Sequence, residues 1–284
     1  MRKQLKELIR PLRKYVYKML GAKPWSYGYL DARWGIIETS IRDSSILQQF
    51  SSHSAPEGFG IGFDERVVEY PWIFSNLKTG KGQKILDAGS TFNYPQVISH
   101  PSLKTNEVSI YTFYPEDINF ISNRISYQFG DLRSLPYKND LFDQVVCQST
   151  IEHVDMDNSI YGYDLEKVKD ITTKSYEYIH VINELVRVLK PNGKLLLTFP
   201  YGKFDNYGFF QQFDSEMVGR ITSIFNQYGT SKDSYIHYYK SGWKFVSADD
   251  CVNTTSHNPH TGQGKENDGA AHCRCVCCIE FIKA

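Results

Sequence analysis

The turn that follows an apolar segment near residue 84 carries residue types suited to ligand binding. Lys84–Leu86 has the character of a buried strand, and Asp87-Ala88-Gly89-Ser90 follows it directly. A strand that ends in this way leaves a carboxylate and bare backbone N–H groups at the carboxyl edge of a sheet. In open α/β sheets, this edge is where ligands bind. The pattern therefore predicts a site for a nucleoside-type cofactor around Asp87, Ala88, Gly89 and Ser90.

Hard oxygen ligands gather further along the chain. Asp155-Met156-Asp157-Asn158 and Tyr161-Gly162-Tyr163-Asp164 bring carboxylates, an amide and phenols close together in sequence. Such groups could hold Mg²⁺, but similar clusters are common in solvated loops that contain helix caps. The interpretation without a metal is favoured, and Mg²⁺ remains the alternative.

Four cysteines lie in the segment His272-Cys273-Arg274-Cys275-Val276-Cys277-Cys278. On an extended strand, the residues of a Cys-x-Cys pair stand about 6.6 Å apart, whereas thiolates bound to one zinc ion lie about 2.3 Å from it. Ile279–Ile282 continues the strand pattern. The segment is therefore predicted to be a buried strand with reduced thiols. His257 and His260, in the preceding loop, could complete a metal site, but nothing in the pattern requires one.

Alternating strands and helices must position these residues. Strands are predicted at 84–87, 107–113, 126–129, 143–148 and 194–199, with an antiparallel terminal pair at 234–239 and 275–282. A long helix is predicted over Leu165–Leu189, and Pro191-Asn192-Gly193 stops it. Alternating βα units imply an α/β fold with a doubly wound, mostly parallel sheet that has an antiparallel edge.

The first 62 residues have a different character. Residues 1–20 place apolar side chains three and four apart and carry seven Lys or Arg residues against one Glu, which predicts a basic amphipathic helix. Such a helix could lie on an anionic membrane or dock on a partner, or pack on its own domain; Pro11 should kink or restart it. Residues 21–62 are interpreted as an irregular cap or lid with a short helix near Ile41–Phe50. The predicted domains are 1–62 and 63–284.

Composition limits the classes of function. The chain has 284 residues and a formal net charge of zero, so a general nucleic-acid field is not supported. Aromatic residues make up 14% of it and suit sugar or nucleoside stacking as well as core packing. It contains no run of about 18 apolar residues that would cross a membrane, and it begins without a signal-peptide pattern. These features predict a cytoplasmic location, with possible peripheral attachment to the inner face of the membrane; the oligomeric state is left open.

The order of motifs resembles that of the class I S-adenosylmethionine-dependent methyltransferases. The resemblance covers roughly 64–284 and rests on four segments in register: Leu86–Ser90, Phe129–Leu132 with Leu135-Pro136-Tyr137, Leu141–Cys147 with Ile151-Glu152-His153-Val154, and Glu184–Leu195. It implies a seven-stranded Rossmann-like methyltransferase fold and S-adenosylmethionine as the cofactor.

The resemblance assigns roles to particular residues. Asp87 would interact with the ammonium of the methionine head, and Gly89 would let the backbone approach it closely. Asp131 would accept from the adenine amino group, and the Leu132 N–H would donate to the ring. Gln148 and Ser149 would line the methionine end.

Two departures from the family pattern stand out. Thr91-Phe92-Asn93-Tyr94 replaces a more open glycine loop, and Tyr111–Phe113 puts aromatic residues where an acid usually binds the ribose. Glu116 could reach the ribose from just beyond. A dinucleotide is the main alternative cofactor, but the Gly-x-Gly-x-x-Gly fingerprint is absent at Gly89.

Proton transfer is the remaining chemistry. A hydroxyl acceptor must lose its proton during methyl transfer, and Glu152 and His153 follow the fourth strand, beside the methyl group in this fold. His153 is therefore a candidate base, with a structural histidine bonded to the neighbouring loop as the alternative. Pro200–Phe213 could stack on and hydrogen-bond to a sugar-like acceptor, or could be a packed loop.

The leading prediction is O-methylation of a sugar or sugar-derived metabolite, because the chain also resembles methyltransferases of bacterial surface-polysaccharide gene clusters. Phe63–Arg66 to Tyr70–Trp72 and Tyr201–Lys203 carry that resemblance. The alternatives are methylation of another small metabolite or a protein side chain, and a catalytically silent adenosyl-binding scaffold.

Overall fold

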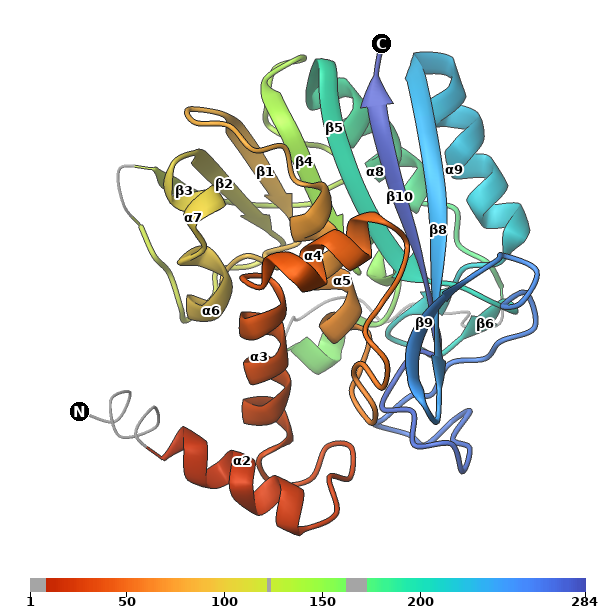
Figure 1. Cartoon of the computed structure of the whole chain (residues 1–284). Coiled ribbons are helices and arrows are strands. Elements are labelled where there is room, and N and C mark those ends of the chain that lie inside the picture. Colours follow the sequence, from red (N-terminus) through yellow and green to blue (C-terminus); the bar gives the residue numbers. More distant parts are fainter. Residues whose placement is uncertain (1–8, 122–123, 162–172) are drawn as a thin grey trace.

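An eight-stranded sheet forms the centre of the computed structural model, which describes residues 9–121, 124–161 and 173–284 (Figure 1). The strand order is β3-β2-β1-β4-β5-β10-β8-β9. The bounds are β1 Lys84–Ala88, β2 Glu107–Thr112, β3 Ile125–Phe129, β4 Phe142–Gln148, β5 Leu189–Pro200, β8 Gly229–Tyr239, β9 Gly242–Val246 and β10 Cys275–Lys283; β6 Asp205–Asn206 and β7 Gln211–Gln212 form a separate small pair.

The pairing confirms the predicted sheet. The neighbours among β3, β2, β1, β4 and β5 all run parallel, whereas β10 is antiparallel to both β5 and β8. The sheet has one strand more than the expected seven. Gly242–Val246 folds back on β8 as an antiparallel hairpin, and Gly242 begins the returning strand with a φ of +105° that favours glycine.

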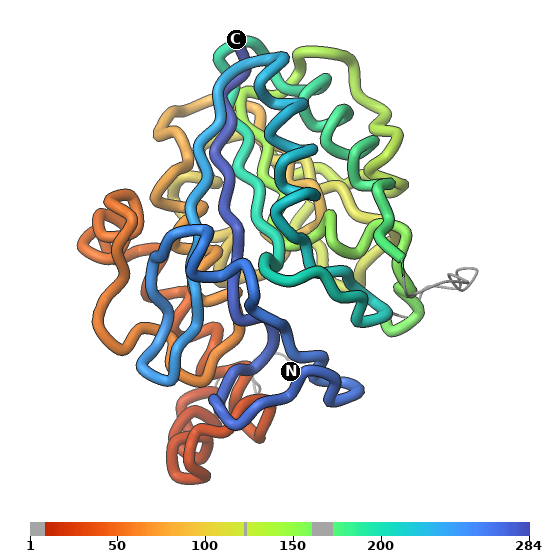
Figure 2. The backbone as a smooth tube through the Cα atoms, turned by 90° about the vertical axis from the view of Figure 1, so that its right-hand side faces the viewer, coloured from red at the N-terminus to blue at the C-terminus, as the bar shows by residue number. Residues whose placement is uncertain are grey.

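Helices cover both faces of the sheet (Figures 1 and 2). One core cluster joins Leu86 and Ala88 of β1 to α8 and α9, and the other joins Ile85 to the helices of the N-terminal half. Burial on both faces explains the continuous apolar runs of the strands. The helices are α2 Arg10–Met19, α3 Tyr29–Ser40, α4 Ser44–Ser51, α5 Arg66–Asn76, α6 Pro95–Ile98, α7 Pro101–Lys104, α8 Tyr178–Val188 and α9 Ser215–Tyr228, with 3₁₀ turns η1 Ile151–His153 and η2 Asn158–Tyr161.

Residues 21–62 are more regular than predicted. The short helix expected near Ile41–Phe50 is α4, but α3 was not foreseen. Helix α3 packs against α2, α5 and α6, so its apolar residues are spread around the helix and give no single stripe. This distribution hides the helix from a periodicity search.

Helix α5 follows Asp64 and contains Pro71. Asp64 accepts a hydrogen bond from the Arg66 N–H at 3.2 Å, as a capping residue would. Pro11 stands in the first turn of α2, where its missing N–H costs nothing. It therefore starts the described helix and does not kink it; residues 1–8 of the predicted helix lie outside the described residues.

The helix predicted over Leu165–Leu189 is wrong in its described part before Tyr178. Helix α8 begins only there, and residues 165–172 lie outside the described residues. The side chain of Gln211 bonds both to the N–H of Ser175, at 3.1 Å, and to its carbonyl, at 3.0 Å. These bonds hold the backbone before α8 in a non-helical form.

Within the described residues, none of the helices combines the length and the apolar character needed to cross a membrane.

Candidate functional site

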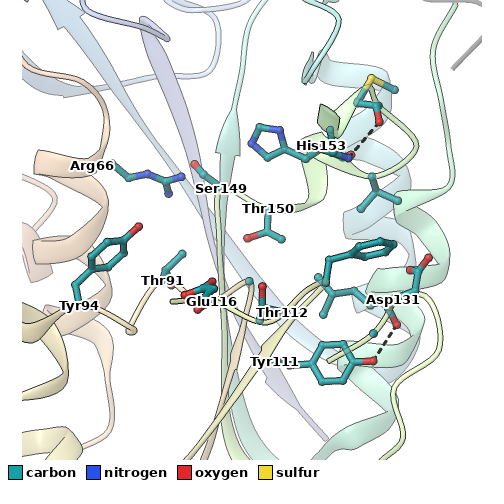
Figure 3. Close-up of a pocket in the computed structure, with 18 of the residues that line it drawn as sticks. Arg66, Thr91, Tyr94, Tyr111, Thr112, Glu116, Asp131, Ser149, Thr150 and His153 are labelled. Carbon is teal, nitrogen blue, oxygen red and sulfur yellow. Dashed lines mark hydrogen bonds between the residues drawn. The ribbon is translucent and has the colours of Figure 1, made fainter. Parts of the chain in front are cut away.

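A cavity of about 530 Å³ lies at the carboxyl ends of β1, β2, β3 and β4, between these strands and the helices α3 and α5 (Figure 3). Six of the predicted site residues line it, namely Gly89, Ser90, Asp131, Leu132, Ser149 and His153. Four do not: Asp87, Ala88, Gln148 and Glu152. The position agrees with the ligand-binding edge expected for this class of sheet.

Asp87 holds the turn after β1 and does not face the cavity. Its carboxylate accepts hydrogen bonds from the Thr91 N–H at 3.0 Å, the Thr91 hydroxyl at 2.9 Å and the Phe92 N–H at 2.7 Å. Burial raises the pKa of Asp87 to about 7, although these three donors favour the charged form. Ala88 is likewise enclosed in the core.

The N–H groups of this turn are less exposed than expected. Besides the two that bind Asp87, the N–H of Gly89 donates to the carbonyl of Tyr111 at 2.9 Å, because β1 and β2 still pair at this point. Ser90, in contrast, lines the cavity, and its hydroxyl is buried without a hydrogen-bond partner in the described residues. It is the polar group of the turn best placed for a ligand.

Gly89 permits the close approach of β1 to the exit of β4. Its φ is +125°, and a Cβ at this position would stand 2.1 Å from the hydroxyl oxygen of Thr150. Only glycine combines this backbone conformation with this contact.

The exits of β2 and β3 form the opposite wall. Thr112, Phe113 and Glu116 line the cavity, so the predicted aromatic edge and the acid beyond it are both present. Glu116 accepts a hydrogen bond from the side-chain amide of Asn93 at 2.5 Å. This contact orients the carboxylate and leaves Glu116 at the cavity wall.

Asp131 forms an ion pair with Arg133, another residue of the cavity wall. Arg133 approaches its carboxylate to 2.6 Å and also reaches Glu177 at 2.8 Å. Although partial burial opposes ionisation, the hydrogen bonds from Arg133 prevail and lower the pKa of Asp131. Asp131 is therefore ionised at neutral pH, beside Leu132 and the ring of Tyr111.

The end of β4 is tied to α5 through Glu69. The Glu69 carboxylate is buried and accepts from the hydroxyls of Ser149 at 2.5 Å and Thr198 at 2.6 Å, and from the amide of Gln148 at 3.2 Å. Gln148 is fully buried and faces away from the cavity, whereas Ser149 lines it.

Two arginines at the cavity were not predicted as site residues. Arg33 of α3 and Arg66 of α5 line it together with Trp34 and Tyr94; Arg66 is paired with Glu69 at 3.1 Å and Arg33 with Asp64 at 2.7 Å. Figure 3 shows Arg66 beside Ser149. No sequence motif places these arginines near the end of β1, because α3 and α5 precede the sheet and fold back over its edge.

His153 lies at the cavity beyond Thr150, and its ring is held on one side. Its Nδ1 is 2.6 Å from the carbonyl oxygen of Phe209. Because a carbonyl can only accept, Nδ1 carries the proton and Nε2 carries the lone pair. Burial lowers the pKa of His153 to about 4, so the imidazole is neutral over the physiological range.

Glu152 is the buried neighbour of this ring. One of its carboxylate oxygens is 3.8 Å from Nε2 of His153, and the other has no hydrogen-bond partner within the described part of the chain. Burial raises the pKa of Glu152 well above its ordinary value. Glu152 therefore lies on the Nε2 side of the His153 ring and does not line the cavity.

The predicted oxygen cluster is engaged in loop contacts in its described part. Asp155 accepts from the Ser175 hydroxyl at 2.7 Å, and Asp157 accepts from the Ser159 N–H at 3.0 Å. Neither belongs to a described group of three His, Cys, Asp or Glu side chains close enough to share a metal ion. Residues 162–164 lie outside the described residues.

The segment after β5 packs beneath the site. Tyr207, Phe209 and Phe210 form a small buried cluster, and none of the residues of Pro200–Phe213 lines the cavity. The described geometry fits the packed-loop alternative, in which Phe209 supports His153. Cys275, Cys277 and Cys278 lie in strand β10, as predicted, whereas Cys273 precedes it; all four are buried and form no disulfide.

Comparison with known proteins supports the class. Residues 112–197, from the end of β2 into β5, match the family described as "Methyltransferase domain". No curated protein sequence matches the chain significantly. Together with the fold and the cavity at the strand ends, the domain match supports an S-adenosylmethionine-dependent methyltransferase.

Several solved structures are similar in fold. A 1,6-didemethyltoxoflavin N1-methyltransferase from Burkholderia thailandensis is 12% identical, with a TM-score of 0.43 and 72% of each chain covered. A SAM-dependent methyltransferase from Methanosarcina mazei is 14% identical, with a TM-score of 0.42, 75% of this chain and 97% of that chain covered. The [4+2]-cyclase SpnF is 17% identical, with a TM-score of 0.35 and 54% of each chain covered. Similarities this weak say nothing about the acceptor.

Proposed function

We propose that this methyltransferase methylates a hydroxyl group of a sugar or sugar-derived metabolite in surface-glycan biosynthesis. The observation that carries the proposal is the neutral His153 imidazole at the cavity, whose Nδ1–H donates to the Phe209 carbonyl. A ring held in this tautomer offers Nε2 as a proton acceptor, which a hydroxyl acceptor needs.

The residues present fit S-adenosylmethionine. The buried Ser90 hydroxyl lacks a partner in the described residues, Arg66 offers a guanidinium to a carboxylate, and Asp131 and Leu132 lie at the far end of the cavity. Arg66 and Ser90 would hold the methionine head, and Asp131 with Leu132 the adenine. When bound, the cofactor supplies an activated methyl group on a sulfonium.

The acceptor end follows from the neighbours of His153. Asp155 and Asn158 line the cavity there and offer a carboxylate and an amide, which pair well with neighbouring hydroxyls. His153 Nε2 would take the proton of the reacting hydroxyl, and the Glu152 carboxyl lies 3.8 Å from that nitrogen.

We also propose that α2 brings the enzyme to an anionic membrane, where surface glycans are assembled. Leu12, Tyr15 and Met19 are 61%, 61% and 68% exposed, and Lys18 is exposed next to them. The opposite side of α2 packs on α3, where Arg13 pairs with Asp31 at 2.6 Å. An apolar stripe edged by lysine suits an anionic lipid surface.

The test is a screen of acceptors with S-adenosylmethionine labelled in its methyl group. Nucleotide sugars and polysaccharide fragments are compared with amines, catechols and protein substrates. The expected result is label in a sugar hydroxyl and a rate that His153→Gln lowers by roughly 10²- to 10⁴-fold. Label in an amine or a protein would overturn the sugar proposal, and a wild-type rate in the variant would remove His153 from the chemistry.

A further inference from the structure

A second polar cluster lies outside the cavity, where the start of α5 meets the entry to β10. It consists of Glu65, His272 and Cys273, each of which offers a ligand atom within 4.8 Å of the other two. Oε1 of Glu65 is 3.0 Å from Nδ1 of His272. Glu65 is 5% exposed and Cys273 is 1% exposed, so the cluster is enclosed by protein.

Two polar atoms of this cluster have no partner within the described residues. Oε2 of Glu65 and Nε2 of His272 are both buried without a hydrogen bond. A buried carboxylate oxygen without a donor is costly. These atoms show that the ion pair between Glu65 and His272 does not satisfy the cluster.

The surroundings also contain an excess of buried acid. Glu65, Glu69 and Glu152 are all buried and lie close enough that each affects the ionisation of the others. Arg66 is paired with Glu69 at 3.1 Å, and the next guanidinium, that of Arg33, is taken by Asp64. A cation at the cluster would favour the ionised forms of these buried carboxyls.

We propose that Glu65, His272 and Cys273 bind one divalent cation of the Zn²⁺ class. A thiolate, an imidazole and a carboxylate form a mixed set that favours zinc over Mg²⁺ or Ca²⁺. Zinc–ligand distances of about 2.0–2.3 Å place tetrahedral ligand atoms about 3–4 Å apart, which is close to the spacing found here. On binding, the metal displaces the proton of the Cys273 thiol and the proton shared by Glu65 and His272.

The site would join two segments that support the cavity. Glu65 directly precedes Arg66, whereas the His272 ring packs against Phe210 at 4.9 Å between ring centroids. Phe209 lies between the two histidines, at 5.7 Å from His153 and 6.1 Å from His272. A bound metal would therefore stabilise the start of α5 and the aromatic residues that pack against His153. The metal would position these residues and would not touch the reacting groups.

The test measures metal content and metal spectra on the whole protein, purified without a histidine tag and kept reduced. Elemental analysis after incubation with Zn²⁺ and desalting should find one zinc ion per chain. Loading with Co²⁺ should produce a thiolate-to-cobalt charge-transfer band. Cys273→Ala should lose both signals, whereas Cys277→Ala, a matched loss of a buried β10 thiol from the opposite face of the sheet, should keep them.

A second measurement, thermal unfolding with and without Zn²⁺, keeps the proposal testable if Cys273→Ala fails to fold. Zn²⁺ should raise the Tm of the wild-type protein by roughly 5 °C or more and should leave the Tm of the conservative variant Glu65→Gln less changed. Absence of stoichiometric zinc, of the cobalt band and of the Tm shift in the wild-type protein would overturn the proposal. The proposal would also be overturned if Cys273→Ala and a folded Cys277→Ala lost zinc and the cobalt band to the same extent. None of these readouts depends on methyl transfer.

Discussion

Asp87 was predicted to be a functional acid at the end of β1, but its side chain does not point into the cavity. The acid at the end of β1 was expected to face the cofactor, but its carboxylate turns back to the N–H groups of Thr91 and Phe92. A carboxylate can serve a ligand or a tight turn, and sequence does not distinguish these uses. Asp87 therefore contributes to the site by shaping the turn that presents Ser90.

Asp87 should also make stability depend on pH. Because its pKa rises from 3.8 to about 7 on folding, the unfolded chain ionises first, and the folded state loses relative stability between these values. The unfolding free energy of the wild-type protein should fall relative to that of Asp87→Asn by about 1.4 kcal/mol per pH unit at most. Urea unfolding at pH 4, 5.5 and 7 measures the difference; a constant difference would contradict the prediction.

His153 should show its burial in the pH profile of the reaction. Since its pKa is lowered to about 4, the ring stays a proton acceptor until the pH approaches that value. The His153 limb in kcat/KM should therefore lie near pH 4 and not near the ordinary histidine value of about 6.5. A limb near 6.5 that disappears in His153→Gln would show that the ring is solvated during catalysis.

Arg66 is expected to bind the carboxylate of the cofactor. Arg66→Lys keeps the positive charge beside Glu69 but loses the two-pronged geometry, so affinity for S-adenosylhomocysteine should fall roughly tenfold, which is about 1.4 kcal/mol. Calorimetry measures this loss. Arg220→Lys, on the exposed side of α9 and paired with Glu216, is the control; equal affinity in both variants would exclude Arg66 from the site.

At the scale of elements, the strands were predictable and the helices only in part. The five parallel strands lie within one or two residues of their predicted positions, apart from the longer β5, because apolar runs with turns at each end are strong signals. Helix α3 escaped notice because it is contacted from several sides. The residues at 173–177 were predicted to be helical, yet Gln211 of β7 binds the backbone of Ser175. In both places, the secondary structure depends on contacts between segments distant in sequence, which local sequence patterns do not reveal.

The junction of β1 with β4 offers a test of an element contact. Gly89→Ala would place a Cβ 2.1 Å from the Thr150 hydroxyl at a φ of +125°, so Thr150 would be pushed toward the cavity. Gly82→Ala has a φ of +72° with nothing within 4 Å and isolates the backbone strain of about 1–2 kcal/mol. Urea unfolding and S-adenosylhomocysteine calorimetry should show the larger loss for Gly89→Ala, and equal losses would remove the contact argument.

For the whole molecule, the wall of the cavity that is formed by the strand ends could be located from sequence, because it follows the order of the strands. The opposite wall could not. Arg33 and Trp34 come from α3 and Arg66 comes from α5, and only the folding of these helices across the sheet edge brings them to the cavity. Candidate acceptor residues were predicted after both β4 and β5, but only those after β4 line the cavity.

The exposed face of α2 predicts binding to vesicles. The protein should co-sediment with vesicles that contain phosphatidylglycerol and less with neutral phosphatidylcholine vesicles, since both apolar contact and charge contribute. The double variant Leu12→Ser with Met19→Ser should lose most of this binding. Tyr228→Ser, at an exposed residue of α9, should keep it; failure of the wild-type protein to co-sediment would contradict the prediction.

The place of β10 has a consequence for biosynthesis. This strand is made after all the others, yet it lies between β5 and β8 and pairs with both. Until residues 275–283 have left the ribosome, β5 and β8 each expose an unpaired backbone edge beside apolar side chains, which favours aggregation. The sheet therefore cannot be completed before β10 has been made, and chaperone binding during translation should persist until that point.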